Sequence, residues 1–399
     1  MEYTEIINMP LKSENKFLDK VDYISIFILI YSSSSFYMLT KPGMLCMLLN
    51  LTCVFMLYII SLLCGKKIII NSNMAVKVIT LCAIIGIGAF SARGEDPKQS
   101  IINLSNIFIA YLFALNYDFK DFAKKFEKVV YFLCVYSIIV YFISTILPDF
   151  IKLFPQTENV NGFKVHNLIF AVVYPNSTPR NSGMFWEPGA FQTYINLALI
   201  IELFYFKQLR KNRLIVYLIT IFTTYSTVGY ITTLFIAYTY ITQLLFSSAN
   251  RDKNSTRNLF FILTIVVIAV VVFLSLNTST SERVFGKLKY IEGTTGGRNT
   301  SASVRMGAFT KPFKVFWDYP LFGAGTRGMT NFALNERYNM NTCTFVNWFA
   351  YFGVFYGALM MRMFYKFAKR FSNKKLIVYM IFFAMFLTTA TENYYRNSS

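Results

Sequence analysis

The sequence is poor in the residues and motifs on which many soluble enzymes depend. Its 399 residues include one histidine, His166, and this excludes a three-histidine metal site and most histidine-based catalytic relays. There is no phosphate-binding loop, no H-E-x-x-H, no G-x-S-x-G and no cysteine and histidine cluster with metal-ligand spacing. General-base chemistry would therefore fall to a carboxylate, and we expect neither a metal nor another cofactor.

Cysteines are few, and acidic residues are outnumbered. Five of the six cysteines lie in or beside apolar segments and only Cys343 falls in a predicted external loop, so no disulfide framework is indicated. The 39 basic and 20 acidic residues give a net charge of +19. In a chain with long apolar runs, this excess is more typical of membrane topology and contact with anionic lipids than of nucleic-acid binding. We therefore expect membrane lipids, and no nucleic acid, as partners.

Long apolar runs dominate what the sequence does contain. Hydrophobic residues make up 55% of the chain and aromatic residues 18%. Eleven segments are apolar over a length that suits about 30 Å of hydrocarbon. These predicted spans are 23–40, 43–64, 76–92, 100–117, 129–147, 186–205, 213–226, 228–246, 259–277, 344–361 and 376–391. We predict an all-α polytopic membrane protein that forms a single integral membrane domain over residues 1–399.

A polar segment, "TTYSTVGYITT" (223–233), interrupts the apolar sequence between the seventh and eighth predicted spans. It is typical either of a tight external turn or of a break inside the membrane. Its small hydroxyl residues also permit close approach between helices. The span count after residue 226 depends on which interpretation is correct.

The distribution of Lys and Arg predicts the orientation of the chain. With the N-terminus inside, the predicted cytoplasmic connections hold 23 basic residues, and the external connections hold 7 once the longest loop is left aside. This predicts an N-in, C-out topology with two large external loops, at about 148–185 and about 278–343. The longer loop carries nine basic and four acidic residues. Positive charge there opposes the positive-inside tendency, so an anionic ligand on this face would explain it.

Arg180 and Glu187 flank the external end of the sixth predicted span. In one interpretation, the arginine contacts lipid headgroups, and the glutamate before Pro188 marks an ordinary helix start whose dipole favours an acid. In the other, the helix start holds Glu187 over an external cavity while Arg180 binds a phosphate through two hydrogen bonds. The spacing alone does not choose between them.

The long loop contains a second candidate region, "SVRMGAFTKPFKVFWDYPLFGAGTRGM" (303–329). Its apolar positions follow a helical stripe through Trp317, and Gly323-x-Gly325 predicts a tight turn after the helix. This pattern is typical of an amphipathic helix that lies on the membrane. Arg305 and Arg327 are instead candidate site residues, because neither would gain from facing acyl chains.

Three more residues are candidates for substrate binding. Arg298 lies in the same cationic loop, Trp186 comes directly before Glu187, and His166 lies in the shorter external loop. His166 is more typical of an ordinary loop histidine than of a catalytic base.

Three motifs follow one another along the chain. "RNSGMFWEPGAFQTYINLAL" (180–199) joins an arginine, a glycine, aromatic residues and Glu-Pro-Gly to a middle span. "TTYSTVGYITTLFIA" places Ser-Thr-x-Gly at the start of a later span, and "SVRMGAFTKPFKVFWDYPLFGAG" joins an arginine, a helix and Pro-Leu-Phe-Gly-x-Gly. With the span count and the cationic external loops, these motifs resemble the O-antigen polymerase (Wzy) family. That family belongs to the wider group of O-antigen ligase and polymerase-like membrane proteins.

The resemblance implies a GT-C-like helical glycosyltransferase of the bacterial inner membrane, with its active site facing the periplasm. The growing glycan would pass from undecaprenyl diphosphate to a hydroxyl of the next lipid-linked repeat unit of O-antigen or a similar surface polysaccharide. Arg180 and Arg305 would stabilise the departing diphosphate, and Glu187 would accept the proton of the acceptor, without a metal. A chain-length regulator and a flippase are implied partners.

One departure from the family patterns concerns the acceptor. O-antigen ligases typically place a histidine in the external loop before the span that begins here near Thr344, whereas this chain has "YNMNTCTFVNW" (338–348). The difference favours a polymerase over a ligase. A ligase or related lipid-linked glycosyltransferase stays an alternative, as does a transporter or flippase. A transporter would be expected to place polar groups at mid-membrane on broken helices.

Overall fold

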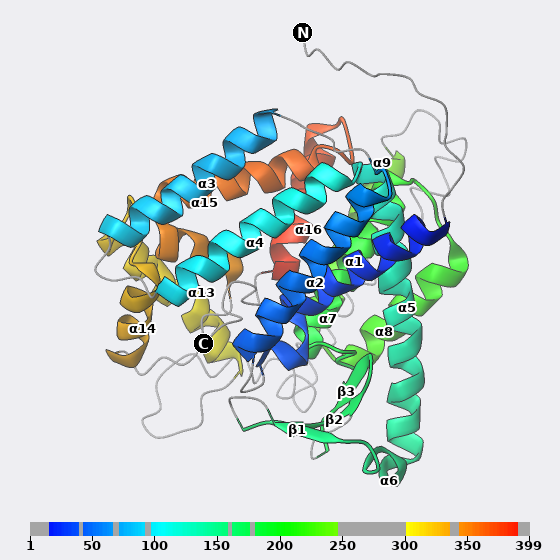
Figure 1. Ribbon diagram of the computed structural model, residues 1–399. Coiled ribbons are helices and arrows are strands. Elements are labelled where there is room, and N and C mark those ends of the chain that lie inside the picture. Colours follow the sequence, from blue (N-terminus) through cyan, green and yellow to red (C-terminus); the bar gives the residue numbers. More distant parts are fainter. Residues whose placement is uncertain are drawn as a thin grey trace, which may run out of the picture.

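The computed structural model describes residues 16–39, 43–66, 72–91, 97–158, 162–175, 180–245, 301–335 and 343–389 (Figure 1). Its helices are α1 (Lys16–Ser34), α2 (Gly43–Leu63), α3 (Ser72–Ser91), α4 (Pro97–Asn116), α5 (Phe119–Ile146), α6 (Pro148–Ile151), α7 (Pro188–Ile200), α8 (Lys211–Thr224), α9 (Thr227–Leu245), α13 (Ser301–Asp318), α14 (Gly325–Asn335), α15 (Thr344–Ala368) and α16 (Lys375–Thr389). A 3-10 turn, η1 (Phe36–Leu39), follows α1, and a π-helical segment, η2 (Ile201–Tyr205), continues α7. Ten of the eleven predicted spans coincide with these helices, and the predicted span 259–277 lies outside the described residues.

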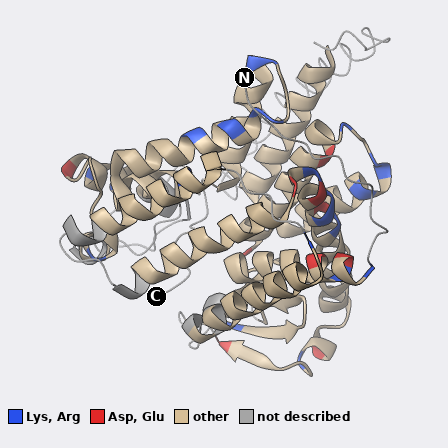
Figure 2. Cartoon of the chain, turned by 45° about the horizontal axis from the view of Figure 1, so that its top comes forward, with Lys and Arg blue, Asp and Glu red and all other residues tan. Residues whose placement is uncertain are grey.

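The described helices have apolar outer surfaces. By length and composition, α5, α9 and α15 are the three described helices able to cross a membrane. Bulky apolar side chains are exposed on several helices, among them Leu48, Ile139, Phe222 and Phe383, and Figure 2 shows charged residues mainly at helix ends and in connections. Exposed apolar surface of this extent suits lipid better than water. The arrangement supports a mainly helical polytopic membrane protein, while the number of spans and the orientation stay predictions.

The expectation of an all-α fold is wrong in the predicted external loop 148–185. There β1 (Gln156–Glu158), β2 (Lys164–Leu168) and β3 (Ala171–Val173) form an antiparallel sheet in the order β1-β2-β3. β-branched and aromatic residues in "KVHNLIFAVV" favour strands, and Ile169 in a left-handed conformation (φ 54°) closes the turn between β2 and β3. Strands this short lack the sustained alternation by which a sequence identifies them. The sheet lies beside the lower end of α5, next to α6 (Figure 1).

Helix α7 is the central element of the described bundle. It packs against α5, α8, α9 and α16, and most of its side chains are buried. Polar side chains in such a position must be hydrogen-bonded. Asn196 meets this requirement, since its Nδ2 donates to Gln192 Oε1 at 2.7 Å and its Oδ1 accepts from Thr233 Oγ1 of α9 at 2.8 Å. These bonds fix α9 against α7 and so position the start of α7.

The polar segment between the seventh and eighth predicted spans forms a tight turn. Helix α8 ends at Thr224, its C-cap residue Tyr225 is left-handed (φ 49°), and α9 begins at Thr227. Helix α9 then runs beside α7 in the same direction, because Gly229 lies against Gln192 and Tyr240 lies near Phe204. The segment is therefore a tight turn, and its external location stays a prediction.

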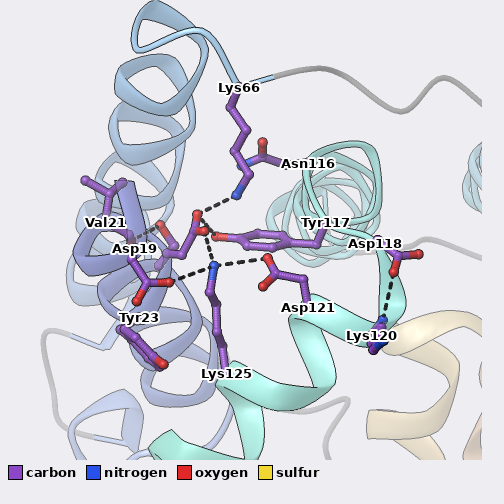
Figure 3. A network of polar contacts seen from close by, with 12 residues as sticks. Asp19, Val21, Tyr23, Lys66, Asn116, Tyr117, Asp118, Lys120, Asp121 and Lys125 are labelled. Atoms are coloured by element: carbon purple, nitrogen blue, oxygen red, sulfur yellow. Dashed lines mark hydrogen bonds and ion pairs between the residues drawn. The ribbon is translucent and has the colours of Figure 1, made fainter. Parts of the chain in front are cut away.

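Two buried ion-pair networks join the connections that the charge count assigns to one face. In the first, Asp22 of α1 accepts from Lys66 Nζ at 2.5 Å, from Lys125 Nζ at 2.5 Å and from Tyr117 Oη at 2.9 Å. Figure 3 shows Lys66 and Lys125 approaching from different elements, with Asp121 beside Lys125. Burial of a carboxylate is costly unless it is paired in this way. The network therefore ties α1, α2 and α4 to the start of α5.

The second network contains Glu127 of α5, whose side chain is fully buried. Its Oε2 lies 2.7 Å from Arg213 Nη1 and 3.3 Å from Arg210 Nη1. Glu202 of η2 accepts the backbone N–H of Arg210 through Oε1 at 3.0 Å. The end of α7–η2 and the start of α8 are thus held against the start of α5, at the end of the bundle opposite to the sheet.

Candidate active site

Arg180 lies where the predicted external loop 148–185 reaches the end of α8. Its Nε donates to the carbonyl of Thr224 at 3.1 Å, and its Nη2 donates to the carbonyl of Tyr225 at 3.0 Å. The last carbonyls of a helix lack partners within the helix and carry partial negative charge, so a guanidinium is favourable there. The same contacts orient Arg180 at the protein surface, where it is exposed.

The residues that follow Arg180 form a hydrogen-bonded turn. Asn181 Nδ2 donates to Ser137 Oγ of α5 at 3.1 Å and to Thr223 Oγ1 of α8 at 3.0 Å, and its Oδ1 accepts from Gly183 N at 3.0 Å. Gly183 has φ of +53°, and a Cβ there would lie 3.0 Å from the ring of Phe191. The Arg-Asn-Ser-Gly part of the first motif therefore needs both the amide and the glycine to lead the chain past the end of α8 to the start of α7.

Tyr174 connects Arg180 with the start of α7. Its Oη donates to the carbonyl of Trp186 at 2.6 Å. Burial raises the pKa of the Tyr174 phenol above its usual range, the nearby Glu187 carboxylate raises it further, and Arg180 lowers it. The phenol therefore lies within electrostatic range of both charged candidates, and it stays a hydrogen-bond donor at neutral pH.

Glu187 occupies the residue before α7, with Pro188 in the first turn. Its backbone is extended (φ −156°, ψ 160°), and its carbonyl accepts from the N–H groups of Ala190 and Phe191. Its carboxylate makes no capping hydrogen bond. The helix-start interpretation thus accounts for the backbone of Glu187 and for Pro188, but not for the position of the carboxylate, which is only partly buried.

A small pocket adjoins Arg180 between α5 and the sheet. The lining residues are Ser137, Val140, Tyr141, Ser144, Ala171, Val172, Val173, Tyr174, Arg180 and Asn181. Hydroxyl, amide and guanidinium groups line it together with apolar strand residues. Such a set of donors around one fixed cation suits an anionic group with oxygen acceptors, such as a phosphate.

The other predicted site residues lie elsewhere or outside the described part. His166 is buried in β2, with Nδ1 3.0 Å from the carbonyl oxygen of Phe154, and it does not line the pocket. Trp186 is half-buried beside Glu187. Arg327 is exposed on α14, which packs on α15 and α13. Arg305 lies on α13, and Arg298 lies outside the described residues.

Comparison with known protein families finds one match. Residues 214–345 match the model of the O-antigen ligase family. The match covers about a third of the chain, from α8 to the start of α15. A comparison with curated proteins found no match.

The match supports a relationship to the O-antigen ligase and polymerase-like proteins, and hence an enzyme that processes lipid-linked glycans. It does not distinguish polymerases from ligases. It includes the second and third motifs, but Arg180 and Glu187 precede it. The roles of these two residues therefore rest on the geometry around α7 and on the likeness of the first motif.

The third motif, which lies within the matched region, packs against a break in α15. Gly353 has φ 76° and ψ −173°, which interrupts the helix. The backbone groups freed there bond to the Pro-Leu-Phe-Gly-Ala-Gly loop: Val354 N donates to the Pro320 carbonyl, and Ala324 N donates to the Ala350 carbonyl, both at 2.8 Å. The backbone of this loop therefore packs against the break in α15.

The predicted amphipathic helix before this loop is present as α13, and it ends at Asp318 as expected. Val315 is buried and α13 packs on α15, whereas the side chain of Trp317 is 72% exposed. Trp317 therefore faces away from the contact with α15. The expected tight turn is also confirmed, because Gly323 and Gly325 both have positive φ.

The second motif, also within the matched region, makes close helix packing possible. Ser226 Oγ accepts the N–H of Gly229 at 3.3 Å and so caps α9. A Cβ at Gly229 would lie 3.1 Å from Gln192 of α7. The motif therefore fixes α9 against α7 directly behind the candidate site.

Sequence reasoning missed Tyr174, Asn181 and Ser137, which position or line the site. Each is a common polar residue that carries no motif by itself. The short spacing between Tyr174 and Arg180 was only a weak indication that the two lie in one site, since a tyrosine between a strand and a polar turn can serve many structural roles. The contacts become evident once β3, α5 and α8 are placed together.

Proposed function

We propose that the chain polymerises lipid-linked oligosaccharide repeat units, of O-antigen or a similar surface polysaccharide, at the Arg180 site. The growing glycan is transferred from undecaprenyl diphosphate to a hydroxyl of the next lipid-linked repeat unit. The protein works in the bacterial inner membrane with this site facing the periplasm. Its substrates are undecaprenyl-diphosphate-linked oligosaccharides, and a flippase and a chain-length regulator act with it.

One observation supports this proposal most: a guanidinium fixed by two backbone carbonyls adjoins a hydroxyl-lined pocket, and the Tyr174 phenol lies within electrostatic range of both this guanidinium and the Glu187 carboxylate. The reaction needs these two charges in different roles. As the acceptor oxygen forms its bond to the anomeric carbon, the bond from that carbon to the diphosphate oxygen breaks. Arg180 stabilises the negative charge that develops on the diphosphate.

Glu187 takes the acceptor proton in this scheme. The acceptor hydroxyl must lose its proton as it attacks, and a carboxylate within hydrogen-bond reach is a suitable base. Its place directly before α7 holds the backbone rigidly, while the carboxylate is not engaged in capping the helix. Arg305, Arg298 and Arg327 provide further positive charge for the diphosphate in this proposal.

The test is the length of the glycan made in a deletion strain that carries variants of the chain. Arg180→Ala and Glu187→Gln should each abolish long chains and leave a single repeat unit, while the protein level in the membrane is unchanged. Lys152→Ala is the control, because Lys152 is an exposed cation of the same loop, paired with Asp149 and not part of the pocket. Normal ladders from both site variants would refute the site.

A ligase is the second candidate, because the matched family is described as O-antigen ligase. The two functions differ in the acceptor. A deletion strain of a ligase would accumulate lipid-linked polymer with nothing attached to the envelope, whereas that of a polymerase would show single repeat units. The absence of histidine from residues 336–343 favours the polymerase.

A transporter gains little support from the break in α15. Transporters use broken helices to offer free backbone groups to a substrate. Here two of the backbone groups beside Gly353, Val354 N and the Ala350 carbonyl, bond to the loop 320–324. Accumulation of repeat units on the cytoplasmic face of a deletion strain would favour transport.

A further inference from the structure

A basic pocket lies at the start of α8, at the opposite end of this helix from Arg180. It is open, has a volume of about 430 Å³, and is lined by Tyr131, Arg210, Lys211, Asn212 and Arg213. Its volume falls within the range of about 300–1,000 Å³ that is usual for small-molecule sites. The pocket plays no part in the proposed glycan transfer, and it belongs to the predicted cytoplasmic connection 206–213.

The pocket places positive side chains at the start of a helix, where negative side chains are favoured. The first turn of a helix presents unpaired N–H groups and partial positive charge, which favour acidic side chains. Arg210 is instead the cap residue of α8, Lys211 and Arg213 follow it, and the first turn contains neither an acidic residue nor a side-chain cap. An anion bound here would compensate both the helix end and the cations.

Two of the three basic side chains, Arg210 and Arg213, are held in place by a buried carboxylate. Arg210 and Arg213 both contact the buried carboxylate of Glu127, and the guanidinium of Arg213 lies 5.7 Å from the ring centre of Tyr131. The Glu202 carboxylate accepts the backbone N–H of Arg210 and lies beside the Glu127 carboxylate. Even with both acids counted, positive charge exceeds negative charge around the pocket. The arginines are thus oriented in advance, and Lys211 is exposed beside them.

The surroundings of the pocket point to a lipid as the source of the anion. Leu209, Ile215 and Leu218 are exposed next to it in sequence, with 50%, 55% and 43% of their surface accessible. On a helix, Ile215 and Leu218 follow the basic residues by one to two turns. They therefore provide an apolar path for acyl chains directly beneath the cations. A soluble phosphate would make no use of such a path.

We propose that Arg210, Lys211 and Arg213 bind the phosphate of an anionic phospholipid on the predicted cytoplasmic side. The lipid phosphate accepts hydrogen bonds from the basic side chains and from the first N–H groups of α8. Its acyl chains lie along the exposed apolar side of the same helix. This site is independent of the glycan-transfer proposal and would exist in a ligase or a transporter as well.

The test is native mass spectrometry of the full chain, released from vesicles of phosphatidylglycerol and phosphatidylcholine. Wild type should retain phosphatidylglycerol in preference. Lys211→Gln should weaken this retention about fivefold, the effect of one basic residue near an anionic lipid, and Lys211→Arg should preserve it. Lys375→Gln is the matched control, because Lys375 is also exposed at the first position of a helix on the same predicted face but does not line this pocket.

The outcomes separate a built site from general surface charge. Equal loss of phosphatidylglycerol in Lys211→Gln and Lys375→Gln, or no preference in wild type, would overturn the proposal. Inorganic phosphate at millimolar concentration is added in a second arm. If it displaces the retained lipid completely, the pocket binds soluble phosphate and the lipid assignment is wrong. Retention that persists in phosphate and is lost only in Lys211→Gln supports the proposal.

Discussion

At the scale of single residues, the fold holds Arg180 and Glu187 in different ways. Arg180 donates two hydrogen bonds to carbonyl groups at the end of α8. Its replacement therefore removes both a positive charge and the hydrogen bonds that hold this helix end. Glu187 is fixed by its backbone, and its carboxylate makes no capping bond. A change of Glu187 to glutamine removes the charge and leaves these backbone contacts in place. It is therefore the sharper test of chemistry, whereas Arg180→Ala tests binding and structure together.

Tyr174→Phe should slow glycan polymerisation about fivefold, because it removes one hydrogen bond, worth about 1 kcal/mol, that positions Trp186 and Glu187. The effect should be the same from about pH 6 to pH 8, since the ordinary phenol pKa is about 10 and burial raises it further in Tyr174. Rates with lipid-linked repeat units at several pH values provide the measurement.

Tyr217→Phe serves as the control for this prediction. The Oη of Tyr217 also donates to a backbone carbonyl, that of Glu127, at 3.2 Å, but it does so in the opposite end of the bundle. Both variants should lower thermal stability slightly, and only Tyr174→Phe should slow polymerisation. An equal change of rate in the two variants would show that Tyr174 acts only through stability.

At the scale of elements, α15 and the loop before it depend on each other. Gly353 has a positive φ, which residues with a side chain rarely adopt. A Cβ at this position would also lie 2.1 Å from the Leu321 carbonyl oxygen. A second glycine, Gly323, faces Tyr351 at similarly close range. The two glycines let the loop backbone reach the break in α15. This explains the Pro-Leu-Phe-Gly-x-Gly pattern by packing rather than by ligand binding.

Gly353→Ala should destabilise the protein by more than about 2 kcal/mol, through backbone strain and the clash with Leu321. Gly86→Ala is the control: Gly86 lies within α3 and a Cβ there meets nothing within 4 Å. That change should be neutral or stabilising by up to about 1 kcal/mol. Thermal unfolding of the purified variants in detergent distinguishes them, and similar melting temperatures for both would contradict the role of the break.

At the scale of the whole molecule, the two ends of the bundle differ in chemistry. One end holds the Asp22 and Glu127 networks and the basic pocket, and the other holds the sheet, Arg180 and Glu187. The charge count assigns the first end to the cytoplasm. Asp22, Lys66 and Lys125 belong to three different connections that the charge count places on one face. Their contacts agree with this grouping.

Asp22→Asn should cost about 3–5 kcal/mol of stability, the usual effect of breaking a buried ion pair from one side. It would leave the Nζ atoms of Lys66 and Lys125 without their shared carboxylate. The control is Asp19→Asn, whose side chain is 52% exposed and 3.2 Å from the same Lys125. An exposed pair contributes about 1 kcal/mol or less. Equal melting temperatures for the two variants would rule out a stabilising role for this network.

The sequence predicted the elements better than the contacts. Hydropathy located ten of the described helices because each carries its signal in its own residues, and the apolar stripe of the helix ending at Asp318 predicted that helix too. The sheet 156–173 was missed because its strands are only three to five residues long. Arg180 and Glu187 were found as candidates, but Tyr174 and Asn181 depend on partners in other elements. His166 proved to be a buried strand residue, which a single sequence does not distinguish from a loop ligand.

Polymerisation by the purified chain in proteoliposomes tests the central proposal most directly. The substrates are undecaprenyl-diphosphate-linked repeat units, and both glycan length and released undecaprenyl diphosphate are measured. We expect wild type and Lys152→Ala to make long chains and to release one carrier diphosphate for each unit added. Glu187→Gln should be slower by about 10²- to 10⁴-fold, as for loss of a general base. Long chains made by Glu187→Gln at the wild-type rate, or no elongation by wild type, would contradict the proposal.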